Sequence, residues 1–100
     1  MIVTVFRSRV KAELQQEYIQ WVGRMNALAK EMPGYISHKG FVAEDGERVT
    51  IVEFESEEAQ RAWAVHPTHI TAQRKGRQDF YVEYRIQVCH VQRENAFPKR

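Results

Sequence analysis

Three residues that lie close together in the sequence could carry out acid–base chemistry: Trp63, His66 and His69. The two histidines are three positions apart, so on a helix they could face the same way. A metal site would need a third His, Cys or carboxylate at a suitable spacing, and none is evident nearby, so we predict no metal. A histidine could instead act as the base of a pocket, because its pKa lies close to neutrality. We favour His69 and keep His66 as a second candidate, since His66 precedes Pro67 and could be only the cap of a helix break.

Trp63 also has a structural interpretation that is the more common one. It lies at helical spacing from Ala59 and Ala62, and aromatic residues in such a stripe usually belong to the core. Its functional interpretation is a pocket wall that stacks on a flat substrate.

A small basic cluster, Arg74, Lys75 and Arg77, follows the histidines. A solvated helix end is the simpler interpretation, because Lys and Arg favour helix C-termini. The alternative is that Arg74 or Arg77 contacts an anionic group at the pocket mouth. Among the four tyrosines, Tyr81 is our candidate to orient a ligand hydroxyl, while the others pack through their rings. We expect Cys89 to be a small buried hydrophobic side chain.

Hydrophobic periodicity predicts the helices that hold these residues. Apolar residues at helical spacing over 14–32 predict a helix of about five turns, ended by a Pro-Gly pair. Ser56 is a predicted N-cap for a second helix. That helix breaks after His66, and a further helical turn follows, which we expect Gly76 to close.

Four strands are predicted, at 2–9, 35–43, 48–55 and 80–91, with an Asp-Gly turn between the second and third. In the last strand, alternation predicts one shared face for Phe80, Val82, Tyr84, Ile86, Val88 and His90. The order β-α-β-β-α-β predicts an α+β, ferredoxin-like fold: a four-stranded antiparallel sheet with both helices on one side. Two helices cover only one face, yet the strands are apolar on both. We therefore expect a homodimer in which two sheet faces pack together.

Composition excludes several classes of protein. The chain has 100 residues, 28% of them charged, with a net charge of +2, which is too mild to indicate a nucleic-acid partner. The longest apolar run is 62–65, so no membrane span is predicted. No signal-peptide pattern follows Met1, and the single cysteine fits a reducing cytoplasm.

An ordered set of motifs then resembles a known family. The run 54–63 (FESEEAQRAW), followed by His-Pro-Thr-His at 66–69, Gly-Arg at 76–77 and Phe-Tyr at 80–81, is similar to the antibiotic biosynthesis monooxygenase (ABM) domain. Met-Pro-Gly-Tyr at 32–35 and the run 84–88 (YRIQV) resemble it too. The resemblance covers residues 1–93 as one domain and leaves 94–100 as a polar C-terminal tail.

The resemblance implies a dimeric α/β barrel with a pocket between the helices and the sheet, bordered by Trp63. It also implies a monooxygenase that needs no cofactor and oxidises a small electron-rich aromatic molecule or quinol with molecular oxygen. His69 or His66 would be the base that removes a phenolic proton, and Trp63, Arg74, Arg77 and Tyr81 would bind the substrate.

Two alternatives to this activity remain. Some relatives cleave heme, using an Asn on the first strand and a His about three turns beyond the Trp. In this sequence Asn occurs only at 26 and 95, so the first strand has none. Gln73 and Arg74 occupy the region where that His would lie. The sequence therefore disfavours heme cleavage. The other alternative is a homodimer of the same fold that binds a small ligand or serves a stress response without catalysis.

Overall fold

The computed structural model of the protein describes residues 1–98, and positions 99–100 of the predicted tail lie outside this part. The strands are β1 (Ile2–Val10), β2 (Tyr35–Val42), β3 (Arg48–Phe54) and β4 (Tyr81–His90). The helices are α1 (Gln15–Ala29), α2 (Glu57–Ala64) and α3 (Pro67–Lys75), with a 3-10 turn η1 (Ala12–Leu14) and a π-helical turn η2 (Gly76–Phe80).

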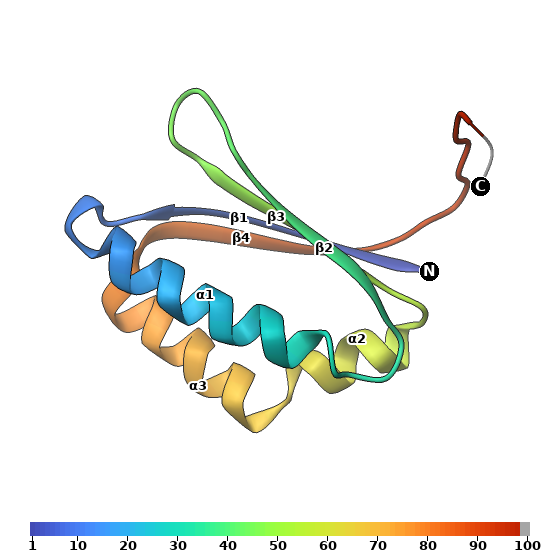
Figure 1. The fold of residues 1–100 in the computed structure, drawn as a ribbon, viewed down its shortest axis with the longest axis horizontal. Helices are drawn as coiled ribbons and strands as arrows, with labels where there is room; N and C mark the ends of the chain where they lie inside the picture. Colours follow the sequence, from blue (N-terminus) through green and yellow to red (C-terminus); the bar gives the residue numbers. More distant parts are fainter. Residues whose placement is uncertain (99–100) are drawn as a thin grey trace.

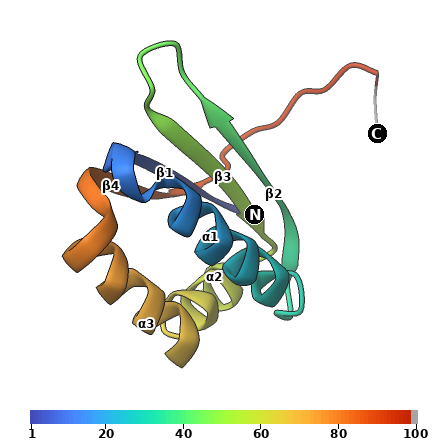
Figure 2. The ribbon, with the colours of Figure 1, turned by 60° about the vertical axis from the view of Figure 1, so that its left-hand side comes forward.

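The four strands form one antiparallel sheet in the order β2-β3-β1-β4. The helices all lie on one face of it (Figure 1), and the turned view shows α1, α2 and α3 side by side beneath the strands (Figure 2). This arrangement confirms the predicted α+β, ferredoxin-like fold. No helix within residues 1–98 has the length and apolar character needed to cross a membrane.

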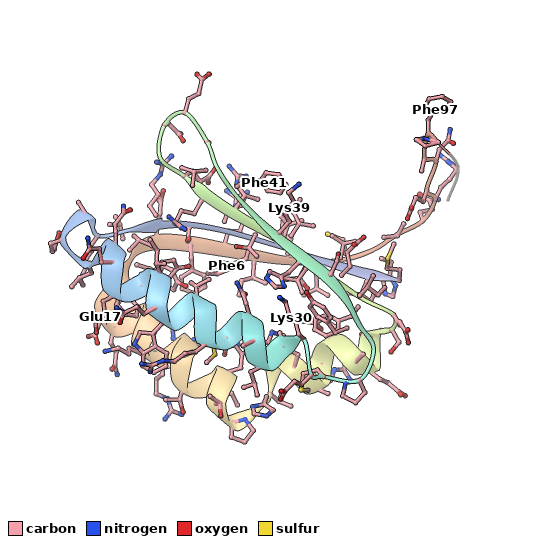
Figure 3. The ribbon with its side chains drawn as sticks, in the orientation of Figure 1. Phe6, Glu17, Lys30, Lys39, Phe41 and Phe97 are labelled. Carbon is pink, nitrogen blue, oxygen red and sulfur yellow. The ribbon has the colours of Figure 1, made fainter. Side chains whose placement is uncertain are left out.

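Alternation along the strands gives the sheet two different faces. Phe6 lies between the sheet and α1, whereas Phe41 and Lys39 lie on the face away from the helices (Figure 3). Register places Val5 opposite Ile51 on this outer face. The strands therefore carry apolar side chains on both faces, and the helices cover only one.

The helix-side core is divided into two clusters. One contains Val10, Tyr18 and Phe80, and the other contains Ala29, Phe54 and Trp63. Partly buried residues of α1 extend both clusters, and they follow the helical spacing predicted over 14–32. Both clusters contribute side chains to the walls of one cavity, described below.

The segment between α3 and β4 differs from the prediction. α3 ends at Lys75 with Gly76 as its C-cap, as predicted, but Gly76 has helical backbone angles and the chain continues through the π-helical turn. β4 therefore begins at Tyr81 instead of position 80. The prediction that Val82 shares a face with Tyr84 is also wrong, because a register shift at Arg9/Val10 interrupts the alternation and leaves Val82 67% exposed.

Cys89 is exposed, which corrects the expectation that it is buried. It pairs with Val3 in the sheet, on the outer face of the edge strand β4, where no helix covers it. After β4, residues 91–98 leave the sheet as an irregular segment that carries Phe97 away from the rest of the molecule (Figures 1 and 3).

Candidate active site

A cavity of about 360 Å³ lies between the helices and the sheet, and its walls are mainly apolar. The sheet side is built from alternate residues of β1, β3 and β4, together with His38 of β2. The helical side comes from α1, α2, α3 and η2. Side chains of β4 that line the cavity remain partly accessible, since Tyr84, Ile86 and Val88 are 40%, 47% and 50% exposed. The cavity is therefore accessible along β4.

Trp63 and His69 form a stacked pair in the cavity wall. Their ring centroids are 4.1 Å apart and the ring planes differ by 11°. Trp63 is only 8% exposed, so it belongs to the core and to the cavity wall at once. The two interpretations offered by the sequence are thus compatible.

The break between α2 and α3 explains how His69 is held. In a continuous helix the carbonyl of Trp63 would accept a hydrogen bond from the backbone N–H of residue 67, but Pro67 has none. Nδ1 of His69 lies 3.0 Å from this carbonyl oxygen. Because a carbonyl can only accept, Nδ1 carries the proton and donates it.

This hydrogen bond fixes the tautomer of the neutral imidazole, which leaves the lone pair on Nε2. The amide Nε2 of Gln73 donates a hydrogen bond of 3.4 Å to the carbonyl oxygen of Ala64. The same nitrogen also lies 3.4 Å from Nδ1 of His69. We regard the second approach as packing, since both nitrogens are donors. Burial, followed by the nearby His66, lowers the pKa of His69, while the bond to the Trp63 carbonyl opposes this shift. The imidazole is therefore neutral at pH 7 and able to accept a proton.

His66 serves the helix break. It is the N-cap of α3, and its Nδ1 accepts a hydrogen bond of 3.2 Å from the backbone N–H of Thr68. Its ring lies near Trp63, with centroids 5.9 Å apart, but it is not among the residues that line the cavity. The contacts of His66 are therefore those of a helix cap and not those of a cavity residue.

The two predicted arginines lie in different places. Arg77 lines the cavity and is itself exposed, so it belongs to the rim, whereas Arg74 is exposed and does not line the cavity. Tyr81 lines the cavity, and its hydroxyl donates a hydrogen bond of 3.2 Å to the hydroxyl of Tyr18. Burial, and then Tyr18, raises the pKa of Tyr81 far above its usual value, so it is a neutral hydrogen-bonding group.

Other polar side chains of the cavity were not singled out by the sequence as site residues. His38 reaches it from β2, with its Nδ1 2.5 Å from the hydroxyl of Tyr35, and burial, followed by Lys30, lowers the pKa of His38. Asn26 lines the cavity from α1, among the apolar residues of that helix. Spacing within α1 could have placed Asn26 beside Met25 and Ala29, but no local signal connects His38 with His69.

Comparisons with known proteins support the same fold and family. The family model "Antibiotic biosynthesis monooxygenase" matches residues 1–75. The uncharacterized protein YqjZ of Bacillus subtilis is 32% identical over 93 residues, which are 93% of this chain and 82% of that protein.

Solved structures of low identity share the fold. SnoaB of Streptomyces nogalater, a cofactor-independent oxygenase, superposes with a TM-score of 0.81 at 17% identity, covering 98% of this chain and 97% of that one. A putative antibiotic biosynthesis monooxygenase of Deinococcus radiodurans gives a TM-score of 0.87 at 10% identity, covering 99% and 100%. On the family model and the B. subtilis relative together, the chain belongs to the antibiotic biosynthesis monooxygenase family.

Proposed function

We propose that the protein is a cofactor-independent monooxygenase that oxidises a small electron-rich aromatic molecule or quinol with molecular oxygen. The observation that carries this proposal is the stacked Trp63–His69 pair, whose neutral imidazole is held by Nδ1 in the wall of an apolar cavity. Family membership and the fold shared with an oxygenase support it.

The chemistry begins with a proton transfer. Nε2 of His69 accepts a phenolic proton, because a phenolate gives an electron to oxygen more readily than the phenol does. The mainly apolar walls, which include the Trp63 indole stacked on His69, limit the water around the reacting groups. Overall the substrate loses two hydrogen atoms and gains one oxygen atom from O₂, while the second oxygen atom leaves as water. The substrate itself supplies all the electrons.

Oxygen uptake with a panel of hydroquinones and anthrones tests this function. We expect consumption by the wild-type protein and a loss of about 10²–10⁴-fold in His69→Ala, the usual contribution of a general base. His90→Ala is the matched control, since this histidine is 77% exposed in its side chain and lies outside the cavity lining.

Two results would count against catalysis. Absence of turnover on every member of the panel contradicts the oxygenase assignment. If the same molecules raise the melting temperature while oxygen consumption stays flat, the protein is a small-ligand-binding member of the fold.

The partner in this proposal is a second copy of the chain. The outer sheet face carries the apolar side chains of Val3, Val5, Phe41, Val49 and Ile51, none of which a helix covers. Ion pairs lie toward one end of this face, including Arg7–Glu47 and Arg9–Asp45 at 3.0 Å and 2.7 Å. Two such faces packed about a two-fold axis bury their apolar centres and Cys89. The exposed single thiol of one chain also fits a reducing cytoplasm.

Sedimentation at micromolar concentration tests the homodimer. Val5→Asp places a charge in the centre of the outer face and should shift the protein toward monomer. Ile19→Asp, at a 54% exposed position on α1, is the control that should leave the mass unchanged. A well-folded wild-type monomer would contradict the homodimer.

A further inference from the structure

Arg77 is unusual among the residues that line the cavity. Of all the lining side chains within residues 1–98, it is the one that carries a permanent charge. Arg7, Arg9 and Arg61 each form an ion pair with a carboxylate, whereas no ion pair to Arg77 is found in this part of the chain. A guanidinium bound by no carboxylate, at the rim of an apolar cavity, is available to an anion supplied by a ligand.

The position of Arg77 relative to His69 is set by one continuous helical segment. His69, Ala72, Gln73 and Arg77 all line the cavity, at positions i, i+3, i+4 and i+8. Eight helical residues correspond to about 12 Å along the axis. The proton-accepting end of the cavity and its cationic end are therefore about two turns apart, with the methyl group of Ala72 between them.

The sheet side of the cavity contributes apolar side chains as well. Phe6, Ile86 and Val88 come from the sheet side and carry no charge. A ligand that satisfies both ends thus needs a hydroxyl group, a flat apolar body and an anionic group, in that order.

We propose that the ligand is a hydroxylated aromatic acid, whose hydroxyl group meets His69 and whose carboxylate is bound by Arg77. This inference rests on the proposed function for the role of His69 and adds the anionic group. A phenolate formed at His69 does not satisfy Arg77, because it lies at the other end of the same helical face. The planar fork of the guanidinium matches a carboxylate with two parallel hydrogen bonds.

The test compares three ligands of the same ring system: 6-hydroxy-2-naphthoate, its neutral methyl ester and 2-naphthol. Titration at fixed salt concentration gives a Kd for each. We expect the wild-type protein to bind the acid at least about tenfold more tightly than the ester, as is usual for a charge-assisted hydrogen bond. Arg77→Gln should remove this preference, and 2-naphthol, which has no anionic group, reports any general change in the cavity.

Arg61→Gln is the matched control. It removes the same charge from α2, where the side chain is 72% exposed and forms an ion pair with Glu57 at the surface. It should keep the preference for the acid, and melting curves of both variants report that they are folded. If Arg61→Gln loses the preference as fully as Arg77→Gln does, the effect comes from overall charge and the proposal is wrong.

Equal affinity of the wild-type protein for acid and ester, or no binding of the acid at millimolar concentration, also overturns it. These binding results are separate from catalysis. If the preference for the acid depends on Arg77 but no oxygen is consumed, the proposed monooxygenase function is wrong and the carboxylate site is kept. If neutral and acidic quinols are turned over equally, the carboxylate site is wrong and the monooxygenase function is kept.

Discussion

Replacing Gly76 by alanine should destabilise the protein, although Gly76 has ordinary helical angles of φ −57° and ψ −49°. The obstacle is space. A Cβ atom at this buried position would overlap Cε2 of the Tyr81 ring and would lie 3.1 Å from Cδ2 and 3.3 Å from Cζ. The ring is itself fixed between Tyr18 and Phe6, with centroid distances of 5.6 Å and 5.5 Å. Either the ring or the turn must therefore shift.

The magnitude follows from two opposing effects. Forcing extra atoms into a packed site usually costs about 1–3 kcal/mol, while alanine stabilises a helix by about 0.5–1 kcal/mol relative to glycine. The two effects leave a net loss of up to about 2.5 kcal/mol in the free energy of unfolding, which lowers Tm by up to about 20 °C in a domain of this size. We expect Gly76→Ala to lie in the upper half of this range, because the overlap with Cε2 is severe.

Gly23→Ala is the matched control. Gly23 also lies in a helix, but no atom of residues 1–98 that its added Cβ could clash with lies within 4 Å, so this variant should be more stable by about 0.5–1 kcal/mol. Thermal and urea unfolding at one fixed protein concentration measure both variants. In the double variant with Tyr81→Leu, the loss caused by Gly76→Ala should shrink, because the obstructing ring is gone. A Gly76→Ala protein as stable as Gly23→Ala would refute this reasoning.

Three further outcomes are expected. Ser56→Ala removes the side-chain oxygen that accepts from the Ala59 N–H and should cost about 1 kcal/mol in urea unfolding; no loss would mean that the cap contributes nothing. Tyr81→Phe removes the bond to Tyr18 and should cost about 0.5–1.5 kcal/mol, with the ring packing retained; a loss as large as that of Tyr81→Ala would contradict this. Because the pKa of His69 is lowered on folding, the unfolded chain binds more protons as pH falls below 6.5, so the wild-type protein should lose stability in that range relative to His69→Gln. If the free energy of unfolding, measured in urea, changes equally in the two proteins from pH 8 to pH 5, His69 does not cause the loss of stability.

Long periodic segments made the fold predictable. The apolar stripe over 14–32 has the spacing of one helical face, and it packs on the sheet as expected. Ser56 also caps α2 as predicted, because a serine before two glutamates is a local signal. Such features depend on neighbouring residues alone, so a single sequence contains them.

The segment between α3 and β4 was not predictable in the same way. A glycine near the end of a helical pattern usually indicates a stop, and α3 does end before Gly76. The π-helical turn that follows was not predicted, and the approach of the Tyr81 ring from the following strand is what requires a glycine here. The register shift beside Val10 likewise depends on pairing between strands more than 60 residues apart. Neither contact leaves a periodic pattern in the sequence.

The candidate site was predictable in part for the same reason. Trp63, His69 and Arg77 belong to one stretch of chain, and the structure brings them to one cavity wall. His38 reaches the same cavity from β2, through tertiary packing that no local spacing predicts. The different positions of Arg74 in α3 and Arg77 in η2 also depend on how these two helical elements are rotated against the sheet.

The hydrogen-bond acceptor for Nδ1 of His69 is a main-chain carbonyl and not a carboxylate side chain. A carboxylate in that place would be lost by one substitution and would bring a full negative charge that favours the imidazolium. The carbonyl brings only a partial charge, and it remains whatever side chain replaces Trp63. It also accepts a hydrogen bond of 3.1 Å from the backbone N–H of His66, and His69 takes the place of the N–H that Pro67 lacks. Substitution at Trp63 therefore leaves the acceptor of Nδ1 in place, whereas substitution at Pro67 would supply a backbone N–H that competes for it.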